Sequence, residues 1–217
     1  MIIILMPEKI AILIDGNNLY HNLKGSKLEP SDIDILKLCD FICSHFGFER
    51  GDIFYYISIP KMDDPVYFKH IKFLKSLNES GIKVITRKLQ YKSTTEAKIG
   101  ILEIIDKMNL CEKCKPVVIG NLLTWIGSVI KKEKGIDVML GVDTIRFTIE
   151  KQYESCIILS GDVDLLSAMK FAESKGGKIF SACTSCGYSS ELQQNFKDRH
   201  FKIERKDILE NCIKDEI

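Results

Sequence analysis

Three aspartates of this 217-residue chain stand directly after short apolar runs rich in β-branched residues. Asp15 follows the run Ile10–Ile14 in the stretch LIDGNNLY, and Asp162 and Asp164 follow Cys156–Leu159 in ILSGDVDLL. Carboxylates that meet at one place repel one another, and a divalent cation relieves this repulsion. Because oxygen-rich sites favour Mg²⁺ or Mn²⁺, the three aspartates predict a site for one of these ions.

Two further aspartates, Asp137 and Asp143, lie in KGIDVMLGVD, just before the second of these runs. Six residues of a helix turn by about 600°, so the two side chains cannot point the same way. Asp143 lies inside the predicted helix Asp137–Lys151, where it has no helix end to cap, and we assign it to the acidic site. Asp137 stands at the helix start and is a further candidate.

Each aspartate also has an ordinary structural role open to it. Asp162 or Asp164 can cap the helix that follows, and Asp137 can cap its own helix, because a carboxylate accepts hydrogen bonds from free backbone N–H groups there. Asp15 can form an Asx turn with Gly16 and Asn17.

The elements that must position these residues alternate between strands and helices. The predicted strands are Ile10–Ile14, Ile53–Ile57, Lys83–Thr86, Cys156–Leu159 and Lys178–Ala182. The predicted helices between them are Ser31–Phe46, Pro65–Leu77, Asp137–Lys151 and Asp164–Lys175. Continuous apolar strands alternating with helices predict an α/β three-layer sandwich with a mostly parallel central sheet of about five strands. Such sheets bind ligands beyond the carboxyl ends of their strands, where Asp15 and Asp162 stand.

The composition, with 45% hydrophobic and 28% charged residues, excludes a disordered or fibrous chain. We expect one domain over residues 1–217, with an insertion at about 88–135 that interrupts the alternation before the fourth strand. Within it, Glu96–Met108 and Leu122–Lys132 are predicted to be helical.

The net charge of +1 hides a basic middle segment. Residues 83–134 carry 11 basic and 5 acidic side chains, a net +6, between flanks of −2 and −3. A basic segment can steer a polyanion toward the protein, although a solvated, Lys-rich insertion is the alternative. The candidate contacts to a nucleic-acid backbone are Arg87, Lys88, Lys92, Lys131, Lys132 and Lys134.

The motifs LIDGNNLY, KGIDVMLGVD and SGDVDLL, in this order, resemble those of the NYN domain family, within the PIN and 5′-nuclease-like superfamily. The resemblance runs from Lys9 to Ile203 outside much of the insertion. It implies a PIN-like fold and metal-dependent ribonuclease activity. It also implies metal-binding carboxylates at Asp15, Asp143, Asp162 and Asp164, with Asp137 and Asn18 matching as well. Leu165 stands where the family usually has an aromatic residue after the second aspartate of SGDxD.

The leading hypothesis is therefore a ribonuclease that uses Mg²⁺ or Mn²⁺ to hydrolyse single-stranded or structured RNA. We expect Ser160 and Asn18 to position a phosphate oxygen or a water. The alternatives are an RNA-binding or adaptor module without physiological cleavage, and a small-molecule phosphohydrolase. The sequence has no P-loop, G-x-S-x-G or G-x-G-x-x-G motif, which leaves a nucleotide-cofactor enzyme little support.

Four of the 8 cysteines form two C-x-x-C pairs, Cys111 with Cys114 and Cys183 with Cys186. Together they supply the four thiolates of a tetrahedral structural zinc site, if the fold brings them together. Free thiols are the alternative. A redox role is less favoured, because neither pair opens a helix straight after the first strand of a thioredoxin-like unit.

The start of the chain, MIIILMPEK, has only six apolar residues before Pro7. This is too short for a membrane span or a secretory signal, so we expect a cytoplasmic protein with no membrane partner.

Overall fold

The computed structural model describes residues 8–93, 102–125, 129–132 and 135–215 of the chain. The chain divides into two compact units. Unit 1 joins Met1–Arg87 with Gly135–Ile217, and unit 2 is Lys88–Lys134.

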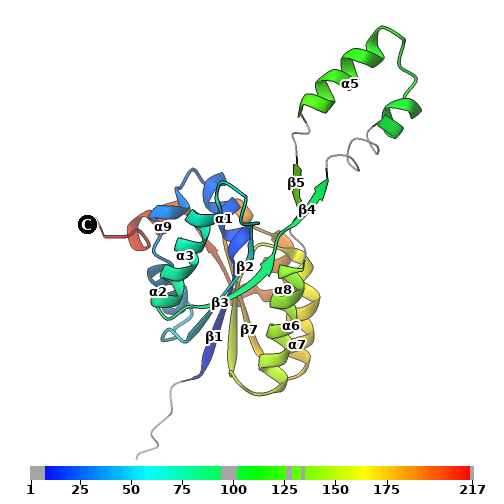
Figure 1. Cartoon of the computed structure of the whole chain (residues 1–217). Coiled ribbons are helices and arrows are strands. Elements are labelled where there is room, and N and C mark those ends of the chain that lie inside the picture. Colours follow the sequence, from blue (N-terminus) through cyan, green and yellow to red (C-terminus); the bar gives the residue numbers. More distant parts are fainter. Residues whose placement is uncertain (1–7, 94–101, 126–128, 133–134, 216–217) are drawn as a thin grey trace, which may run out of the picture. The chain divides into compact units, whose positions relative to one another are not determined.

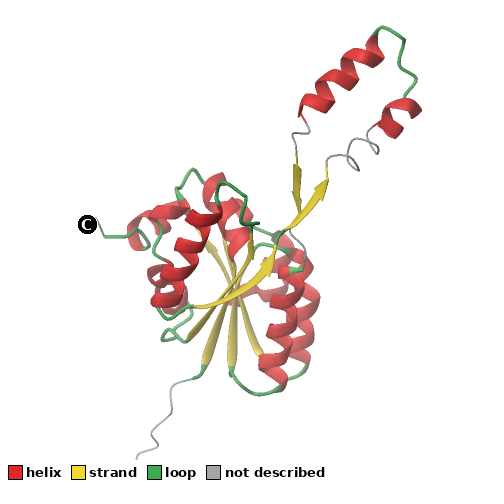
Figure 2. Ribbon diagram, in the orientation of Figure 1, coloured by secondary structure: helices red, strands yellow, loops and turns green. Residues whose placement is uncertain are grey.

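Unit 1 is built on a six-stranded sheet in the order β3-β2-β1-β6-β7-β8. Figure 2 shows this sheet in yellow with helices packed around it. Its strands are β1 (Ile10–Asp15), β2 (Asp52–Ile59), β3 (Lys83–Lys88), β6 (Ser155–Leu159), β7 (Lys178–Thr184) and β8 (His200–Ile203). β1 pairs in parallel with β2 and β6, and β6–β7 and β7–β8 are parallel too. The five predicted strands are confirmed.

The prediction of about five strands missed β8. This edge strand has only four residues, and its two ends are buried while Lys202 is exposed. It therefore carries no continuous apolar run that could mark it as a strand.

Helices cover both faces of the sheet, which confirms the three-layer sandwich (Figure 1). One face carries α1 (Gly16–Gly25), α2 (Ile35–His45), α3 (Tyr67–Glu79) and α9 (Arg205–Asn211). The other face carries α6 (Ile136–Ile149), α7 (Leu166–Ser174) and α8 (Ser190–Phe196). Of the helices in unit 1, α1 and the short α8 and α9 were not predicted.

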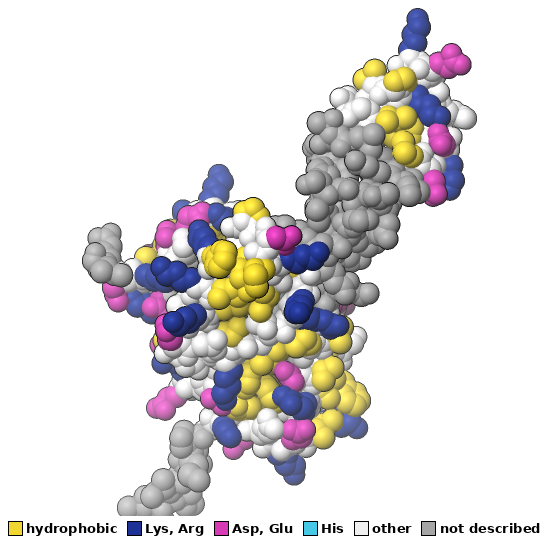
Figure 3. All heavy atoms as spheres, in the orientation of Figure 1, with side chains coloured by type: hydrophobic (Ala, Val, Ile, Leu, Met, Phe, Trp, Pro, Cys, Tyr) yellow, Lys and Arg dark blue, Asp and Glu magenta, His cyan; other side chains and the backbone are white. Residues whose placement is uncertain are grey.

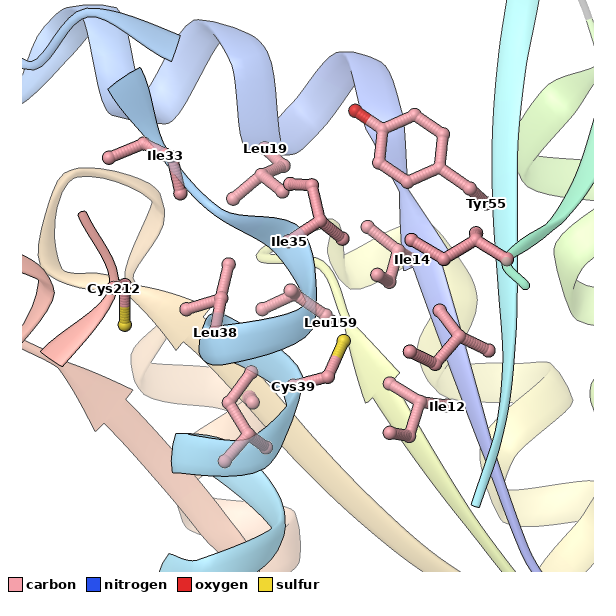
Figure 4. Close-up of a cluster of buried hydrophobic side chains, with 14 of the residues drawn as sticks. Ile12, Ile14, Leu19, Ile33, Ile35, Leu38, Cys39, Tyr55, Leu159 and Cys212 are labelled. Atoms are coloured by element: carbon pink, nitrogen blue, oxygen red, sulfur yellow. The ribbon is translucent and has the colours of Figure 1, made fainter. Parts of the chain in front are cut away.

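The central strand β1 is buried at all six positions, because its side chains alternate between two cores. Ile10, Ile12 and Ile14 belong to the core under α1, α2 and α3, whereas Ala11 and Leu13 belong to the core under α6 and α7. In Figure 4, Ile12 and Ile14 lie among side chains of α2 and of the neighbouring strands. Burial on both faces is why β1 is a continuous apolar run rather than an alternating one.

Three helices begin later than the sequence suggested, α2 at Ile35, α3 at Tyr67 and α7 at Leu166. A side-chain cap explains the start of α2, and a preceding turn explains that of α7. Asp34 Oδ1 accepts the backbone N–H groups of Leu36 and Lys37 at 2.8 and 3.1 Å, so α2 begins at Ile35. α7 begins at Leu166 because a 3₁₀ turn over Val163–Leu165 precedes it.

Unit 2 contains a two-stranded antiparallel sheet and helices. Its elements are β4 (Gln90–Ser93), α5 (Cys114–Trp125), β5 (Val129–Lys132) and a helical segment over residues 102–107. The predicted helix Leu122–Lys132 is wrong over its last four residues, since Val129–Lys132 pairs with β4 and forms strand hydrogen bonds instead. The first part of the predicted helix Glu96–Met108 lies outside the described residues. In the described parts of both units, no helix is long and apolar enough to cross a membrane.

Unit 1 should fold without unit 2, because both core clusters take their residues from outside Lys88–Lys134. Gln90 pairs with Lys132 across the antiparallel strands, so a Gly/Ser linker of about five residues can bridge the gap. With residues 88–134 replaced by this linker, we expect one cooperative thermal transition by circular dichroism. Its midpoint should lie within about 5 °C of the parent's, a difference on the order of 1–2 kcal/mol. A non-cooperative transition would show that unit 1 needs unit 2 to fold.

Candidate active site

The register of two neighbouring strands brings Asp15 next to residues 160–162, which we call the SGD turn. β1 and β6 are parallel and pair Ile14 with Leu159, so the next residues, Asp15 and Ser160, leave the sheet side by side. The Ser160 hydroxyl donates to Asp15 Oδ2 at 3.2 Å, and the backbone N–H of Asp162 donates to Ser160 Oγ at 3.2 Å. The structure therefore brings together Asp15, Ser160 and Asp162, three of the residues singled out in the sequence.

The carboxylate of Asp15 is almost completely buried, with 7% of the residue exposed. Burial raises the pKa of Asp15, and the negative charge of Asp162 adds to this effect. Hydrogen bonds from the backbone of Asn18 and from Ser160 oppose it but do not outweigh burial. A cation at this position would favour the ionised form of Asp15.

Asn18 is engaged inside the protein. Its side-chain oxygen accepts the backbone N–H of Gly161 at 3.0 Å and the side-chain amide of Asn22 at 2.7 Å. These bonds hold the SGD turn against α1. No larger residue fits at Gly161, since a Cβ there would lie 1.8 Å from the carbonyl oxygen of Gly187. The structure thus gives Asn18 a role in placing Asp162.

Asp143 is connected to the same site through a buried tyrosine. The Tyr56 hydroxyl donates to Asp143 Oδ2 at 2.8 Å, and Tyr56 pairs with Asp15 across β1 and β2. Burial raises the pKa of Tyr56, so its hydroxyl remains a donor. Arg146, one turn further along α6, forms an ion pair with Asp143 Oδ1 at 2.9 Å.

Sequence reasoning missed Tyr56 and Arg146. The Asp143–Arg146 spacing of three residues on a predicted helix is a signal that could have found Arg146. Tyr56 stands inside the strand DIFYYISI, where a buried aromatic residue is expected for packing alone.

Asp137 and Asp164 line one shallow cleft of about 190 Å³ between α6 and the start of α7. The floor of this cleft is mainly apolar and includes Gly141 and Leu165. The backbone N–H of Asp164 donates to Asp162 Oδ1 at 3.0 Å, so Asp162 caps the 3₁₀ turn that places Asp164. The cleft therefore adjoins the turn that carries Asp162.

The site offers the oxygen donors that Mg²⁺ prefers. In the described part of the chain, no three His, Cys, Asp or Glu side chains are close enough to form a complete metal site. Mg²⁺, however, is usually held by one or two carboxylates together with waters and substrate phosphates. Asp15 and Asp162, which share Ser160, supply such a pair, and the charge of Asp15 is insufficiently balanced within the protein.

The basic residues singled out in the sequence fall at the end of β3 and in unit 2. Arg87 and Lys88 are exposed at the end of β3. Lys92 lies in β4, and Lys131 and Lys132 lie in β5, whereas Lys134 is outside the described residues. Their contacts with RNA stay a prediction.

The two C-x-x-C pairs lie in different units. Cys114 is the first residue of α5, and its backbone N–H donates to Cys111 Sγ at 3.3 Å. Hydrogen bonds from the Cys114 side chain and from backbone N–H groups lower the pKa of Cys111. Cys183 is buried, which raises the pKa of its thiol, and its Sγ lies 3.7 Å from Nε2 of His200; Cys186 is exposed. Zinc binding by the four cysteines together stays a prediction.

Comparison with known proteins identifies a family and shows a related fold. The family model described as NYN domain matches residues 9–204, which is most of the chain. A crystal structure of a protein of unknown function from Vibrio parahaemolyticus RIMD 2210633 is similar, with a TM-score of 0.53 and 16% sequence identity. The similarity covers 95% of this chain and 97% of that one, and it shows a shared fold. No curated protein matches the chain.

We predict that Asp15→Asn raises the free energy of unfolding at neutral pH. Asparagine caps a helix about as well as aspartate, so α1 keeps its acceptor for the Asn18 N–H while the buried charge is removed. The pKa of Asp15 is raised in the folded protein, so ionising this group costs stability as the pH rises through that pKa. The stability gain should therefore shrink as the pH falls toward about 4. Urea denaturation over this pH range is the measurement.

The matched control is Asp34→Asn, which changes the capping aspartate of α2. We expect it to alter stability by less than about 0.5 kcal/mol. Equal gains for the two variants would contradict the assignment of a buried, uncompensated charge to Asp15.

Proposed function

The chain belongs to the NYN domain family and has a PIN-like nuclease fold, and from this premise we propose that it is a metal-dependent ribonuclease. The observation that carries the proposal is the buried Asp15 carboxylate, joined through Ser160 to Asp162 at the carboxyl ends of adjacent strands. Burying a charge that the protein does not balance is costly. A site that binds a cation together with a phosphate accounts for that cost.

Asp15 and Asp162 would hold Mg²⁺ or Mn²⁺ directly. Asp143 and Asp164 would act on the ion through waters, and Asp137 lines the same cleft as Asp164. When bound, the ion supplies charge neutralisation at the scissile phosphate and an activated water for in-line attack. Waters and phosphate oxygens complete the coordination that the carboxylates leave open.

The other residues of the site keep these carboxylates in place. Ser160 orients Asp15 and receives the backbone N–H of Asp162, while Asn18 fixes the turn between them. Tyr56 and Arg146 both bind Asp143, so this carboxylate is held on α6 facing β2. Each carboxylate is thus positioned before substrate arrives, which avoids the cost of ordering it during the reaction.

The alternative of an RNA-binding or adaptor module predicts a different experimental result. Such a module would bind RNA without cleaving it in the presence of a divalent ion, and its aspartates would have only structural roles. A small-molecule phosphohydrolase is less compatible with a shallow cleft that leaves Asp164 exposed.

We predict that Asp162→Asn reduces Mn²⁺-dependent cleavage of single-stranded RNA by at least about 100-fold, since even residues behind metal ligands contribute 10- to 100-fold. The melting temperature should stay equal or rise, because the charge of Asp162 opposes ionisation of Asp15. The side-chain oxygen of the new asparagine can still accept the Asp164 N–H, which preserves the turn.

Asp207→Asn is the matched control, because Asp207 also accepts a backbone N–H but lies on α9, on the opposite layer from α6. It should cleave RNA at the parental rate. If Asp162→Asn cleaves as fast as the parent, the catalytic assignment is wrong.

We further predict that replacing Lys131, Lys132 and Lys134 with alanine weakens RNA binding and flattens its dependence on salt. If all three lysines contact phosphates of a single strand, the slope of log affinity against log salt should fall by about 2, since each contact contributes roughly 0.7. Fluorescence anisotropy over a salt series, without divalent ions, measures this slope.

The control variant replaces Lys75, Lys178 and Lys206, which form ion pairs with glutamates in unit 1. It lowers the net charge by the same amount. If the two triple variants gave the same slope of log affinity against log salt, the three lysines of unit 2 would not contact RNA.

A further inference from the structure

The most exposed aromatic side chain in the described part of unit 1, Phe68, comes after β2, which ends at the same edge of the sheet as Asp15. Tyr56 of β2 pairs with Asp15, and the strand continues for three more residues, or about 10 Å, before it ends at Ile59. The chain then turns and enters α3 at Tyr67. The start of α3 therefore lies beyond the carboxyl ends of the strands, at the same end of the sheet as the proposed active site.

Three apolar side chains of this segment are open to solvent. Phe68 is 76% exposed, Met62 72% and Val66 51%, and Phe68 is the most exposed large apolar residue in the described part of the chain. In Figure 3, apolar side chains gather on the face of unit 1 that carries α3 and β3, with Lys and Arg side chains around them.

The turn that presents these side chains is held in a defined conformation. The side-chain carboxylate of Asp64, which is buried, accepts the backbone N–H of Val66 at 3.1 Å. The backbone carbonyl of Asp64 accepts the N–H of Tyr67 at 2.9 Å. The half-buried ring of Tyr67 meets Phe68 edge to face, with the ring centroids 5.4 Å apart. The ring of Phe68 thus contacts Tyr67, while most of its surface stays exposed to solvent.

Three exposed lysines lie close to Phe68 in the sequence. Lys69 is its neighbour, Lys72 lies one helical turn further on the same face of α3, and Lys61 precedes the turn. Among residues 60–72 the one exposed acidic side chain is Asp63. Lysines are depleted from the centres of protein–protein interfaces, whereas aromatic rings interleaved with cations are typical of surfaces that bind single-stranded nucleic acid.

We infer that Phe68 is a stacking platform for an unpaired base of RNA whose backbone is bound by Lys61, Lys69 and Lys72. This inference rests on the proposed function, which gives RNA as the ligand. It adds that the RNA is single-stranded rather than duplex. A base in a duplex is already stacked on its neighbours and does not offer its face to an external ring.

The test uses the full chain without divalent ions, so that RNA is bound but not cut. The probes are a labelled single-stranded RNA of about ten nucleotides, within the site sizes of single-strand binders, and its duplex. Phe68→Ala should weaken binding of the single strand by about 5- to 150-fold and change duplex binding by less than about twofold. Phe68→Trp should bind the single strand at least as tightly as the parent. In the Mn²⁺ assay, Phe68→Ala should raise KM and leave kcat unchanged, as expected for lost uniform binding.

Phe171→Ala is the matched control. Phe171 is 46% exposed and has a lysine amine 5.1 Å from its ring centre, but it lies in the second half of α7, which runs away from the carboxyl ends of the strands. It should bind both probes as the parent does. A 2-aminopurine base in the single strand adds a direct signal for stacking, since its fluorescence should be quenched by the parent and less quenched by Phe68→Ala.

Three results would overturn the inference. These are parental binding of the single strand by Phe68→Ala, equal losses for single strand and duplex, or a change of oligomeric state in sedimentation with RNA binding unaffected. The last result would make the patch a protein-docking surface. A different result would contradict the proposed function alone. In that case the parent and Asp162→Asn would both leave RNA uncut, while binding of the single strand would still depend on Phe68.

Discussion

The burial of one carboxylate, that of Asp15, is the constraint on which the organisation of unit 1 depends. An ionised group with little contact to water needs hydrogen bonds or a counter-charge, and the protein supplies only part of what Asp15 requires. The Asn18 N–H and the Ser160 hydroxyl bind its two oxygens, but the nearest charge, that of Asp162, has the same sign. This unbalanced charge is the reason for our proposal that a cation and a phosphate bind there.

Close backbone packing keeps this arrangement fixed. A Cβ at Gly16 would lie 2.4 Å from the ring of Tyr55, and one at Gly161 would meet the backbone of Gly187. Glycine at these positions allows α1 and the SGD turn to approach the sheet closely enough for Asn18 to bridge them. The polar network thus depends on the same contacts that bury the apolar side chains of β1.

Charge is distributed unevenly along the chain. The acidic residues proposed for catalysis come from unit 1, whereas residues 83–134 carry the excess of basic side chains. Contacts from lysines to the phosphate backbone provide affinity that does not depend on sequence. A stacking residue such as Phe68 would add a preference for unpaired bases, which lysines alone cannot provide.

The sequence by itself determined the fold class, the five longer strands and the aspartates at their ends, because buried parallel strands leave continuous apolar runs that polar residues terminate. It did not determine β8, α1 or β5, whose short segments are stabilised by pairing and packing with distant residues rather than by a local pattern. The contacts of Ser160, Asn18 and Tyr56 were also decided only by the tertiary structure. Their partners lie on other elements, up to 145 residues away in the case of Ser160 and Asp15. Strand register, which no local pattern encodes, brings them together.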